Sequence, residues 1–178
     1  MRIISGKHKG RRITAPKKLP VRPTTDMTKE GLFNILNNSY YFDEIRVLDL
    51  FAGTGNISYE FASREAEKVV SVDKHMDCVK FIAATSKKLE LPIEVIKGDV
   101  YKYLEKTTDK FDIIFADPPY DLDIAKFEEI PALVFRRALL LEGGVLIIEH
   151  PKTMDLSQLE HLSKQRKYGG SVLSFFEA

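Results

Sequence analysis

The sequence predicts an α/β protein built on a doubly wound, mostly parallel sheet. From residue 45 onward, short apolar segments rich in β-branched residues alternate with longer segments whose apolar residues recur at a helical spacing. Strands that are apolar throughout are typical of a parallel sheet covered on both faces. The intervening segments are long enough for the right-handed crossovers that join parallel strands. We therefore expect helices on both sides of one sheet.

The elements follow in a regular order along the chain. A helix is expected first, from Thr25 to about Asn37, because the threonine and aspartate oxygens at positions 24–26 can cap its first turn. Its role is to link the N-terminal segment to the sheet. Strands are expected at about 46–50, 68–73, 93–97, 111–117 and 143–149, with helices near 55–64, 75–91, 99–106 and 123–140.

The C-terminal segment breaks this repeat. Residues 165–168 and 172–176 flank the pair Gly169-Gly170, which predicts a hairpin rather than another crossover unit. The sheet should therefore have seven strands and end with an antiparallel one.

The composition suits one cytoplasmic domain. A chain of 178 residues can bury roughly 70% of the surface that its unfolded form exposes. The single cysteine, Cys78, cannot form an internal disulfide, and no apolar stretch approaches the roughly 20 residues needed to cross a membrane. The N-terminus lacks the features of a secretory signal. The histidines are dispersed, so no metal site is expected.

Basic residues are concentrated at the N-terminus. Residues 1–22 contain eight basic and no acidic residues, whereas acids are in excess in the rest of the chain. We expect residues 1–23 to form a basic arm, folded as a small β-hairpin around Gly6 and Gly10, and residues 24–178 to form the main domain. A solvated or disordered tail is the alternative. Such an arm favours contacts with a nucleic-acid backbone, assigned here to Arg2, Lys7, His8, Lys9, Arg11, Arg12, Arg22 and Thr25.

A glycine-rich turn, Phe51-Ala52-Gly53-Thr54-Gly55, follows the first predicted strand of the sheet. Glycine has no Cβ to obstruct a ligand, and the free N–H groups at the start of a helix attract negative charge. A dinucleotide-binding fingerprint would have a third glycine where this chain has Ser58. A tight turn without any ligand is the other interpretation of this motif taken alone.

Three aspartates follow successive predicted strands, and their side chains should meet at one edge of the sheet. Asp73 can accept hydrogen bonds from ribose hydroxyls, and Asp49 can bind an ammonium group or an ordered water. Asp99 can accept from an adenine amino group while Val100 packs on the ring. Each acid alone is more often a cap or turn residue, but together they indicate a ligand site. The expected contacts are Thr24, Asp49, Phe51, Ala52, Gly53, Gly55, Asn56, Asp73, Lys74, Asp99 and Val100.

The tetrapeptide Asp117-Pro118-Pro119-Tyr120 ends the fourth predicted strand of the sheet. A residue before proline is held extended, so the Asp117 carboxylate and the Pro118 carbonyl have one rigid arrangement. These two acceptors can bind the two hydrogens of a planar amine, while the Tyr120 ring stacks on a base. Downstream of the glycine turn, the four residues predict a catalytic site for S-adenosylmethionine-dependent methylation of an exocyclic amine of a nucleic-acid base.

These motifs resemble those of the bacterial RsmD family of 16S rRNA guanine-N2 methyltransferases. The resemblance covers nearly the whole chain and is most specific in Arg2-Ile3-Ile4-Ser5-Gly6…Lys9-Gly10-Arg11 and in Arg22-Pro23-Thr24-Thr25-Asp26. It implies the class I methyltransferase sheet and S-adenosylmethionine as donor, with S-adenosylhomocysteine as product. One position departs from the family pattern, because Met27 stands where arginine is usual.

The resemblance also implies roles for individual residues. Gly53 and Gly55 would border the methionine part of the donor, Asp73 its ribose and Asp99 its adenine, while Asp117 to Tyr120 would hold the guanine. The implied partner is 16S rRNA, in a small ribosomal subunit or an assembly intermediate. We expect a cytoplasmic monomer without membrane contact.

Three other functions are compatible with parts of the pattern. A DNA adenine-N6 methyltransferase would also present an amine to Asp117, but the chain shows no separate region for reading a DNA sequence. A nucleotide-binding oxidoreductase would leave Asp117 to Tyr120 without a role. A non-catalytic RNA-binding or ribosome-assembly module would need only the arm.

Overall fold

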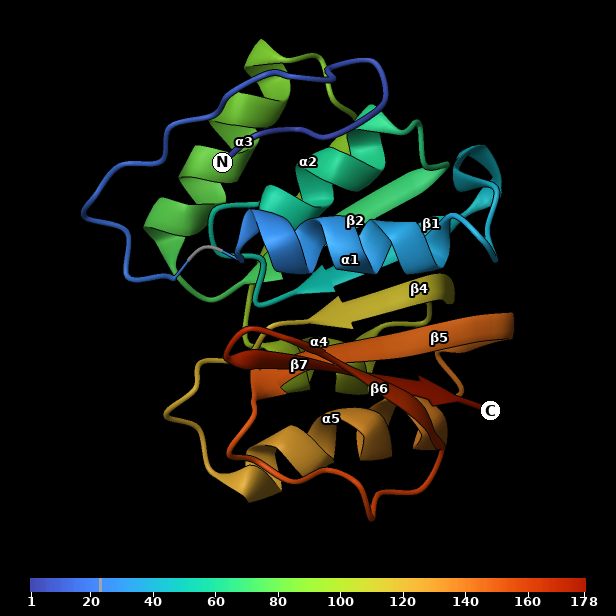
Figure 1. Ribbon diagram of the computed structural model, residues 1–178. Coiled ribbons are helices and arrows are strands. Elements are labelled where there is room, and N and C mark those ends of the chain that lie inside the picture. Colours follow the sequence, from blue (N-terminus) through green and yellow to red (C-terminus); the bar gives the residue numbers. More distant parts are fainter. Residues whose placement is uncertain (23) are drawn as a thin grey trace.

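The computed structural model describes residues 1–22 and 24–178. Its centre is a seven-stranded sheet with the strand order β3-β2-β1-β4-β5-β7-β6 (Figure 1). The strands are β1 (Arg46–Leu50), β2 (Lys68–Asp73), β3 (Ile93–Lys97), β4 (Phe111–Ala116), β5 (Leu140–Pro151), β6 (Leu162–Tyr168) and β7 (Ser171–Glu177). The pairs among β1 to β5 are parallel, whereas β7 is antiparallel to both of its neighbours. The predicted doubly wound sheet with an antiparallel last strand is confirmed.

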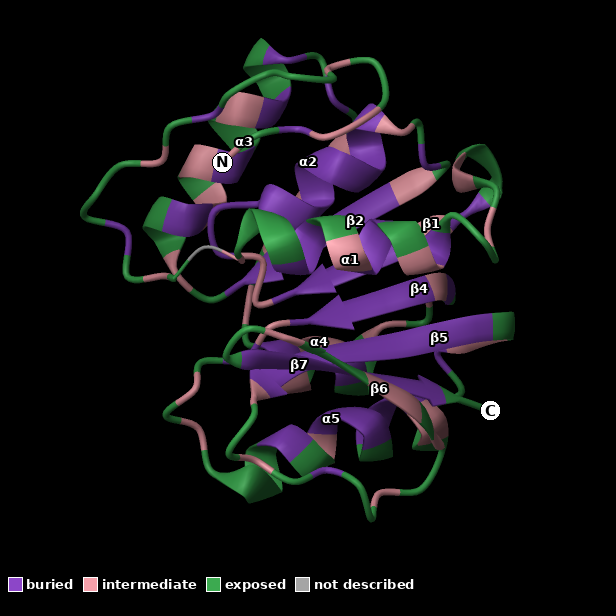
Figure 2. Cartoon of the chain, in the orientation of Figure 1, coloured by how far each residue is buried: buried purple, intermediate pink, exposed green. Residues whose placement is uncertain are grey.

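Helices cover both faces of the sheet (Figure 1). Those on one face are α1 (Asp26–Leu36), α2 (Asn56–Ser63) and α3 (Met76–Lys88), and those on the other are α4 (Val100–Lys106) and α5 (Ile124–Arg136). A short 3-10 helix, η1 (Phe42–Glu44), precedes β1. The side chains of successive strand residues point to opposite faces of the sheet, and each face has its own hydrophobic core. Val47 therefore packs under α1 and α2, while Leu48 packs under α4 and α5. The central strands are therefore mostly apolar, and most of their residues are buried (Figure 2).

Helix α5 ends earlier than the expected residue 140. Ala138 has a φ of 49°, a left-handed conformation that does not continue an α-helix, and the Leu139 N–H then donates to the Val134 carbonyl. From Leu140 the chain pairs with Phe111, so β5 begins where the end of a helix was predicted. That prediction was wrong because a short apolar run fits either element.

The basic arm folds back on itself, although with less strand structure than the predicted hairpin. A single antiparallel bridge joins Arg2 to Arg12, and the Ile3 N–H donates to the Arg11 carbonyl at 2.9 Å. Ile3 and Ile13 are 1% and 8% exposed and belong to the core beneath α1 and α2. The described part of the arm is therefore packed on the main domain. Pro23, which the predicted arm and the Arg-Pro-Thr-Thr-Asp motif include, lies outside the described residues.

Gly6 allows the arm to pass directly over the end of α2. Its φ is 84°, and a Cβ at this position would lie 1.9 Å from the Ser63 carbonyl oxygen. The neighbouring Lys7 N–H donates to that oxygen at 2.7 Å, and the Ser63 hydroxyl donates to the Ser5 carbonyl at 2.7 Å. The arm thus satisfies a carbonyl group that the end of a helix leaves free.

A buried ion pair joins the arm to the two helices beneath it. The Lys29 ammonium of α1 lies 3.0 Å from the Glu60 carboxylate of α2, and neither side chain is accessible to solvent. Lys29 also donates to the Arg2 carbonyl and to the Asn56 side-chain oxygen, each at 2.8 Å. Burial lowers the pKa of Lys29, and the negative charge of Glu60 opposes this shift. The remaining acceptor positions of Glu60 are used by Ile4, Ser5 and Arg64.

We expect Lys29→Met to destabilise the domain by about 3 kcal/mol or more, because Glu60 would remain buried without its main counter-charge. The loss should appear as a lower midpoint of urea unfolding followed by circular dichroism. As a control, Lys7→Met breaks an exposed pair with Glu65 and should change the free energy of unfolding by less than about 1 kcal/mol. Equal effects of the two substitutions would contradict the importance assigned to the buried pair.

Candidate active site

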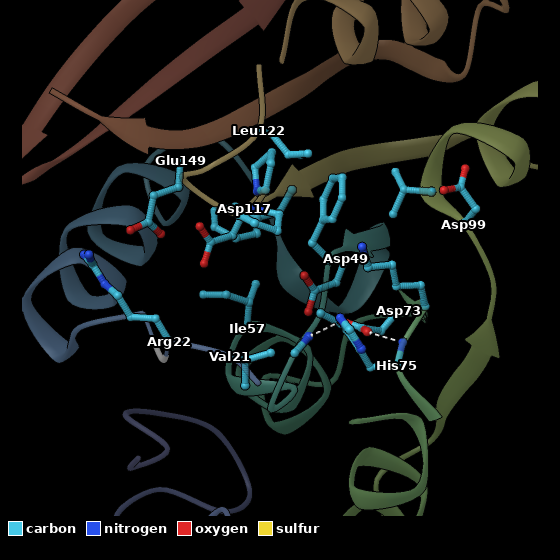
Figure 3. A pocket seen from close by; sticks show the side chains of 18 of the residues that line it. Val21, Arg22, Asp49, Ile57, Asp73, His75, Asp99, Asp117, Leu122 and Glu149 are labelled. Carbon is cyan, nitrogen blue, oxygen red and sulfur yellow. Dashed lines mark hydrogen bonds between the residues drawn. The ribbon is translucent and has the colours of Figure 1, made fainter. Parts of the chain in front are cut away.

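A cavity of about 710 Å³ is formed by residues at and beyond the carboxyl ends of β1, β2 and β4. This is the edge at which ligands bind in open α/β sheets, and the volume suits a small-molecule ligand. Most of the residues singled out in the sequence line it, and Figure 3 shows several of them. They are Arg22, Thr24, Asp49, Phe51, Ala52, Gly53, Asn56, Asp73, Lys74, Asp99, Val100, Asp117, Pro118, Pro119 and Tyr120.

The other predicted residues lie outside the lining. Gly55 precedes α2 with a φ of 81°, and a Cβ there would lie 2.7 Å from the Tyr59 ring, so glycine is needed to shape the turn. Thr25 caps α1 by accepting from the Thr28 N–H at 3.2 Å. The arm residues that do not line the cavity are Arg2, Lys7, His8, Lys9, Arg11 and Arg12.

Asp73 holds the glycine turn in place. Its carboxylate, at the end of β2, accepts from the Gly53 N–H at 2.9 Å and from the His75 N–H at 2.8 Å (Figure 3). Each carboxylate oxygen has a further lone pair with which it can bind a ligand hydroxyl. The same side chain can therefore shape the turn and contact a ribose.

Asp49 is buried beside the turn, with 2% of its surface exposed. Its Oδ2 accepts from both the backbone N–H and the hydroxyl of Ser58, and that hydroxyl also contacts the Ser71 hydroxyl. Burial raises the pKa of Asp49 to about 7, and the bonds from Ser58 act against this shift. Ser58, at the place of the third glycine of a dinucleotide fingerprint, thus positions a carboxyl group.

Asp99 and Val100 lie where β3 leads into α4. Asp99 is the N-cap of that helix, and its exposed carboxylate accepts from the Lys102 N–H at 3.0 Å. Val100 is buried, with 3% of its surface exposed. Both line the same cavity, so this turn contributes one polar and one apolar side chain to it.

Asp117 and Tyr120 follow β4 and line the same cavity. The Thr24 hydroxyl donates a long hydrogen bond of 3.5 Å to the Asp117 carboxylate. The Tyr120 hydroxyl pairs with the Ser171 hydroxyl at 2.9 Å, and the Arg22 guanidinium lies 4.7 Å above the Tyr120 ring. A cation therefore covers one face of the ring that was expected to stack on a base.

Glu149 also lines the cavity and was not expected from the sequence. It lies on β5, is 3% exposed, and points toward the same space as Asp117 (Figure 3). Burial raises the pKa of both carboxyl groups, the charge of Glu149 raises that of Asp117 further, and Arg22 opposes both shifts. A signal was available, because Glu149 is, like Asp49 and Asp117, an acid at the ligand-binding end of an apolar strand.

Several apolar residues of the wall were also missed, including one from the arm and one from α2. Val21 of the arm and Ile57 of α2 both line the cavity (Figure 3). A Cβ at Gly53 would lie 3.4 Å from Val21, so the arm approaches the glycine turn closely. No sequence pattern marks Val21, because its position depends on how the arm is folded.

A family model described as "Conserved hypothetical protein 95" matches residues 1–177. The chain belongs to this family. The "Putative rRNA methyltransferase YlbH" of Bacillus subtilis is 35% identical over 163 residues, which cover 89% of this chain and 86% of that protein. The "Ribosomal RNA small subunit methyltransferase D" of Haemophilus influenzae is 29% identical over 180 residues, which cover 98% of this chain and 91% of that protein. A solved structure, "Putative methyltransferase yhhF" from Escherichia coli, matches with a TM-score of 0.83 at 24% identity, covering 99% of this chain and 96% of that chain.

Membership of the Conserved hypothetical protein 95 family confirms the resemblance to RsmD, and the fold is that of the class I methyltransferases. Met27, where the chain departs from the family pattern, is 54% exposed on α1 and lies beside Gly169. Among the described residues, no helix is both long and apolar enough to span a membrane, and no three acid, histidine or cysteine side chains are arranged so that they could hold a metal ion.

Asp49 should make the stability of the fold decrease as the pH rises. Its carboxyl group, with a pKa of about 7 in the folded state and about 4 when unfolded, binds a proton more tightly when folded. Its contribution to the free energy of unfolding is therefore full below about pH 4 and is lost as the pH rises to about 7. Asp49→Asn removes this titration, so its free energy of unfolding should fall less than that of the wild type over that interval.

Urea unfolding at several pH values between about 4 and 8 tests this expectation. Asp121→Asn, at an exposed position, is the control and should keep the pH dependence of the wild type. Identical profiles for the wild type and Asp49→Asn would show that Asp49 does not titrate in this range.

Proposed function

We propose that this protein is an S-adenosylmethionine-dependent rRNA methyltransferase that methylates the N2 amine of a guanine in 16S rRNA. One observation carries the proposal: the glycine turn and Asp117 to Tyr120, which are far apart in the sequence, line one cavity. One end of the cavity suits a methyl donor and the other suits a base amine. The names of the relatives, an rRNA methyltransferase and a ribosomal RNA small subunit methyltransferase, support the same reaction.

The glycine end of the cavity suits S-adenosylmethionine. Gly53, with a φ of 56°, brings backbone rather than side chain to the ligand, and Asp73 offers carboxylate oxygens to ribose hydroxyls. Val100 provides an apolar surface for an adenine ring, with Asp99 at its edge. When bound, the donor supplies an electrophilic methyl group on a positively charged sulfonium. The acids that favour this positive charge are Asp49, Asp73, Asp117 and Glu149.

Asp117 and Pro118 are the residues that orient the acceptor amine. The Asp117 carboxylate and the Pro118 carbonyl accept its two hydrogens, which directs the nitrogen lone pair out of the plane of the base. Tyr120 supplies aromatic surface to a base that has left its stack. Held in this way, the nitrogen can attack the methyl group directly. Burial raises the pKa of Asp117, so this carboxylate is suited to accept the proton that the methylated amine releases.

The arm supplies the RNA contacts in this proposal. Two of its cations are paired within the protein, Arg2 with Glu30 and Lys7 with Glu65. Lys9, Arg11 and Arg12 are exposed, and the described residues offer them no ion pair. We assign phosphate contacts to these cations and to Arg22, which lies beside the catalytic tetrapeptide. The full set of proposed RNA contacts is Arg2, Lys7, His8, Lys9, Arg11, Arg12, Arg22 and Thr25.

Because the arm is packed on the rest of the protein, it suits an RNA partner that is itself folded. Hydrogen bonds and buried isoleucines hold the arm against α2, so its cations form a fixed arrangement. Such a surface matches the shape of a folded RNA. We therefore propose 16S rRNA in a small ribosomal subunit, or in an assembly intermediate, as the substrate of a cytoplasmic monomer that uses no metal.

Asp117→Ala should abolish methyl transfer and preserve donor binding. It removes one of the two acceptors for the amine, and the loss of such a positioned group costs about 100-fold or more in rate. Transfer is measured as radioactive methyl incorporation into 16S rRNA of subunits from a strain that lacks the enzyme. Affinity for S-adenosylhomocysteine, measured by calorimetry, should stay near the wild-type value. Asp121→Ala, in the same loop and exposed, should retain both properties, and wild-type transfer by Asp117→Ala would refute the assignment.

Replacing Lys9 and Arg11 together by glutamine should weaken binding to the small subunit. Each lost phosphate contact should make the slope of log affinity against log salt less steep by about 0.7 to 0.9. Fluorescence binding measurements at several salt concentrations give this slope. The matched control replaces Lys106 and Lys110, two exposed cations near the amino end of β4, at the edge of the sheet away from the cavity. Equal losses in the two double variants would exclude the arm as the main RNA surface.

A further inference from the structure

Glu149 is a buried acid whose carboxylate the fold satisfies only in part. It is 3% exposed, and no donor among the described residues meets hydrogen-bond geometry at its Oε2. Burial raises its pKa, although the Ser171, Thr24 and Tyr120 hydroxyls lie close enough to lower it. A buried oxygen without a partner carries a free-energy cost, which is larger when the group is charged. Glu60 shows the contrast, because both of its oxygens accept from neighbouring donors. The fold therefore leaves the Oε2 of Glu149 without a well-placed donor, which points to a role with a ligand.

The sheet places Glu149 next to Asp117. Ala116 of β4 and Ile148 of β5 are paired in register, and the two acids directly follow them. Both carboxylates point into the cavity, with the Arg22 side chain on the same side of it (Figure 3). The cavity thus offers a third acceptor beside the Asp117 carboxylate and the Pro118 carbonyl.

The chemistry of the bases gives this third acceptor a specific use. On the Watson–Crick edge of guanine, the ring nitrogen N1 beside the exocyclic amine carries a hydrogen, so N1–H and the N2 amine present three donor hydrogens on that edge. In adenine and cytosine, the ring nitrogen beside the amine has a lone pair and accepts a hydrogen bond. A base that has left its stack is identified through this edge. An acceptor next to the amine-binding group therefore distinguishes guanine from the other two bases.

We propose that Glu149 determines the specificity for guanine, with its free Oε2 accepting from N1–H while Asp117 and Pro118 hold the N2 amine. The inference rests on the proposed function, because it concerns which base that function acts on. With guanine, three donors meet three acceptors and the orphan oxygen gains its partner. With adenine, the Glu149 carboxylate would face a lone pair, which is repulsive. Glu149 is thus a substrate-contacting residue that distinguishes guanine from adenine.

The test uses two nucleosides that share the 2-amino group. Guanosine carries N1–H, whereas 2-aminopurine riboside has a lone pair at N1. Their dissociation constants are measured by NMR titration of the protein saturated with S-adenosylhomocysteine. The wild type should bind guanosine at least about tenfold more tightly. In Glu149→Gln the ratio should fall to within about threefold, because an amide can present either its oxygen or its nitrogen to N1.

The two nucleosides also differ at position 6, but this difference is the same for every variant. A difference between variants in the ratio of the two dissociation constants therefore reflects the contact with N1 of the base. An unchanged ratio in Glu149→Gln overturns the role of Glu149 and leaves the proposed function standing. If the wild type binds neither nucleoside, or binds adenosine as tightly as guanosine, then the proposed function fails and the inference fails with it.

Two further variants distinguish an effect on base recognition from an effect on folding. Glu142→Gln changes an exposed acid on the same strand, outside the cavity, and should keep the wild-type ratio. Glu149→Asp keeps the charge but withdraws it by one methylene, so its ratio should lie between those of the wild type and Glu149→Gln. Because Glu149→Gln removes an incompletely satisfied acid, its Tm should equal or exceed that of the wild type. A wild-type ratio in both Glu149→Asp and Glu149→Gln contradicts the proposal.

Discussion

The buried ion pair between Lys29 and Glu60 is the interaction on which the rest of the site depends. Two charges can remain in a protein interior only when nearly all of their donors and acceptors have partners. Here the partners come from the arm, from α1 and from the start of α2, so these segments have one compatible arrangement. Asn56 extends the network by donating to the Thr24 carbonyl at 3.3 Å, and the Thr24 hydroxyl reaches Asp117. The arm, the glycine turn and the tetrapeptide Asp117 to Tyr120 are therefore held in a fixed relation.

A second constraint is the concentration of acids at the ligand-binding edge of the sheet. Asp73 is satisfied by two backbone N–H groups and Asp49 by Ser58, so these two carboxyl groups mainly shape the turn. Asp117 accepts one long hydrogen bond, from Thr24, the Oε2 of Glu149 has no well-placed donor among the described residues, and burial raises the pKa of both acids. A cavity of this kind favours ligands that bring hydrogen-bond donors and positive charge. A base amine and a sulfonium have these properties, which is why one cavity suits both substrates of the proposed reaction.

Much of the fold could be predicted because its signals are local. The apolar strands, the helical spacing and the glycine pair between β6 and β7 each depend on residues close together in the chain, and the sheet confirms them. The boundary between α5 and β5 could not be predicted, since the apolar residues from Leu139 onward fit either element until Leu140 pairs with Phe111. The folded arm was predicted in outline, but its buried isoleucines were not, because they depend on a surface that α1 and α2 build together.

The sequence by itself determined the class of fold, the glycine turn and the rigid tetrapeptide Asp117 to Tyr120, because glycine and proline constrain the backbone wherever they occur. It also placed Asp49, Asp73 and Asp117 at the ends of strands, and parallel strands bring such ends to one edge. Only the tertiary structure decided that Glu149 lies beside Asp117, that Arg22 covers Tyr120, and that Lys29 meets Glu60. These contacts join residues that the order of strands and the path of the arm bring together, and no local pattern encodes that order.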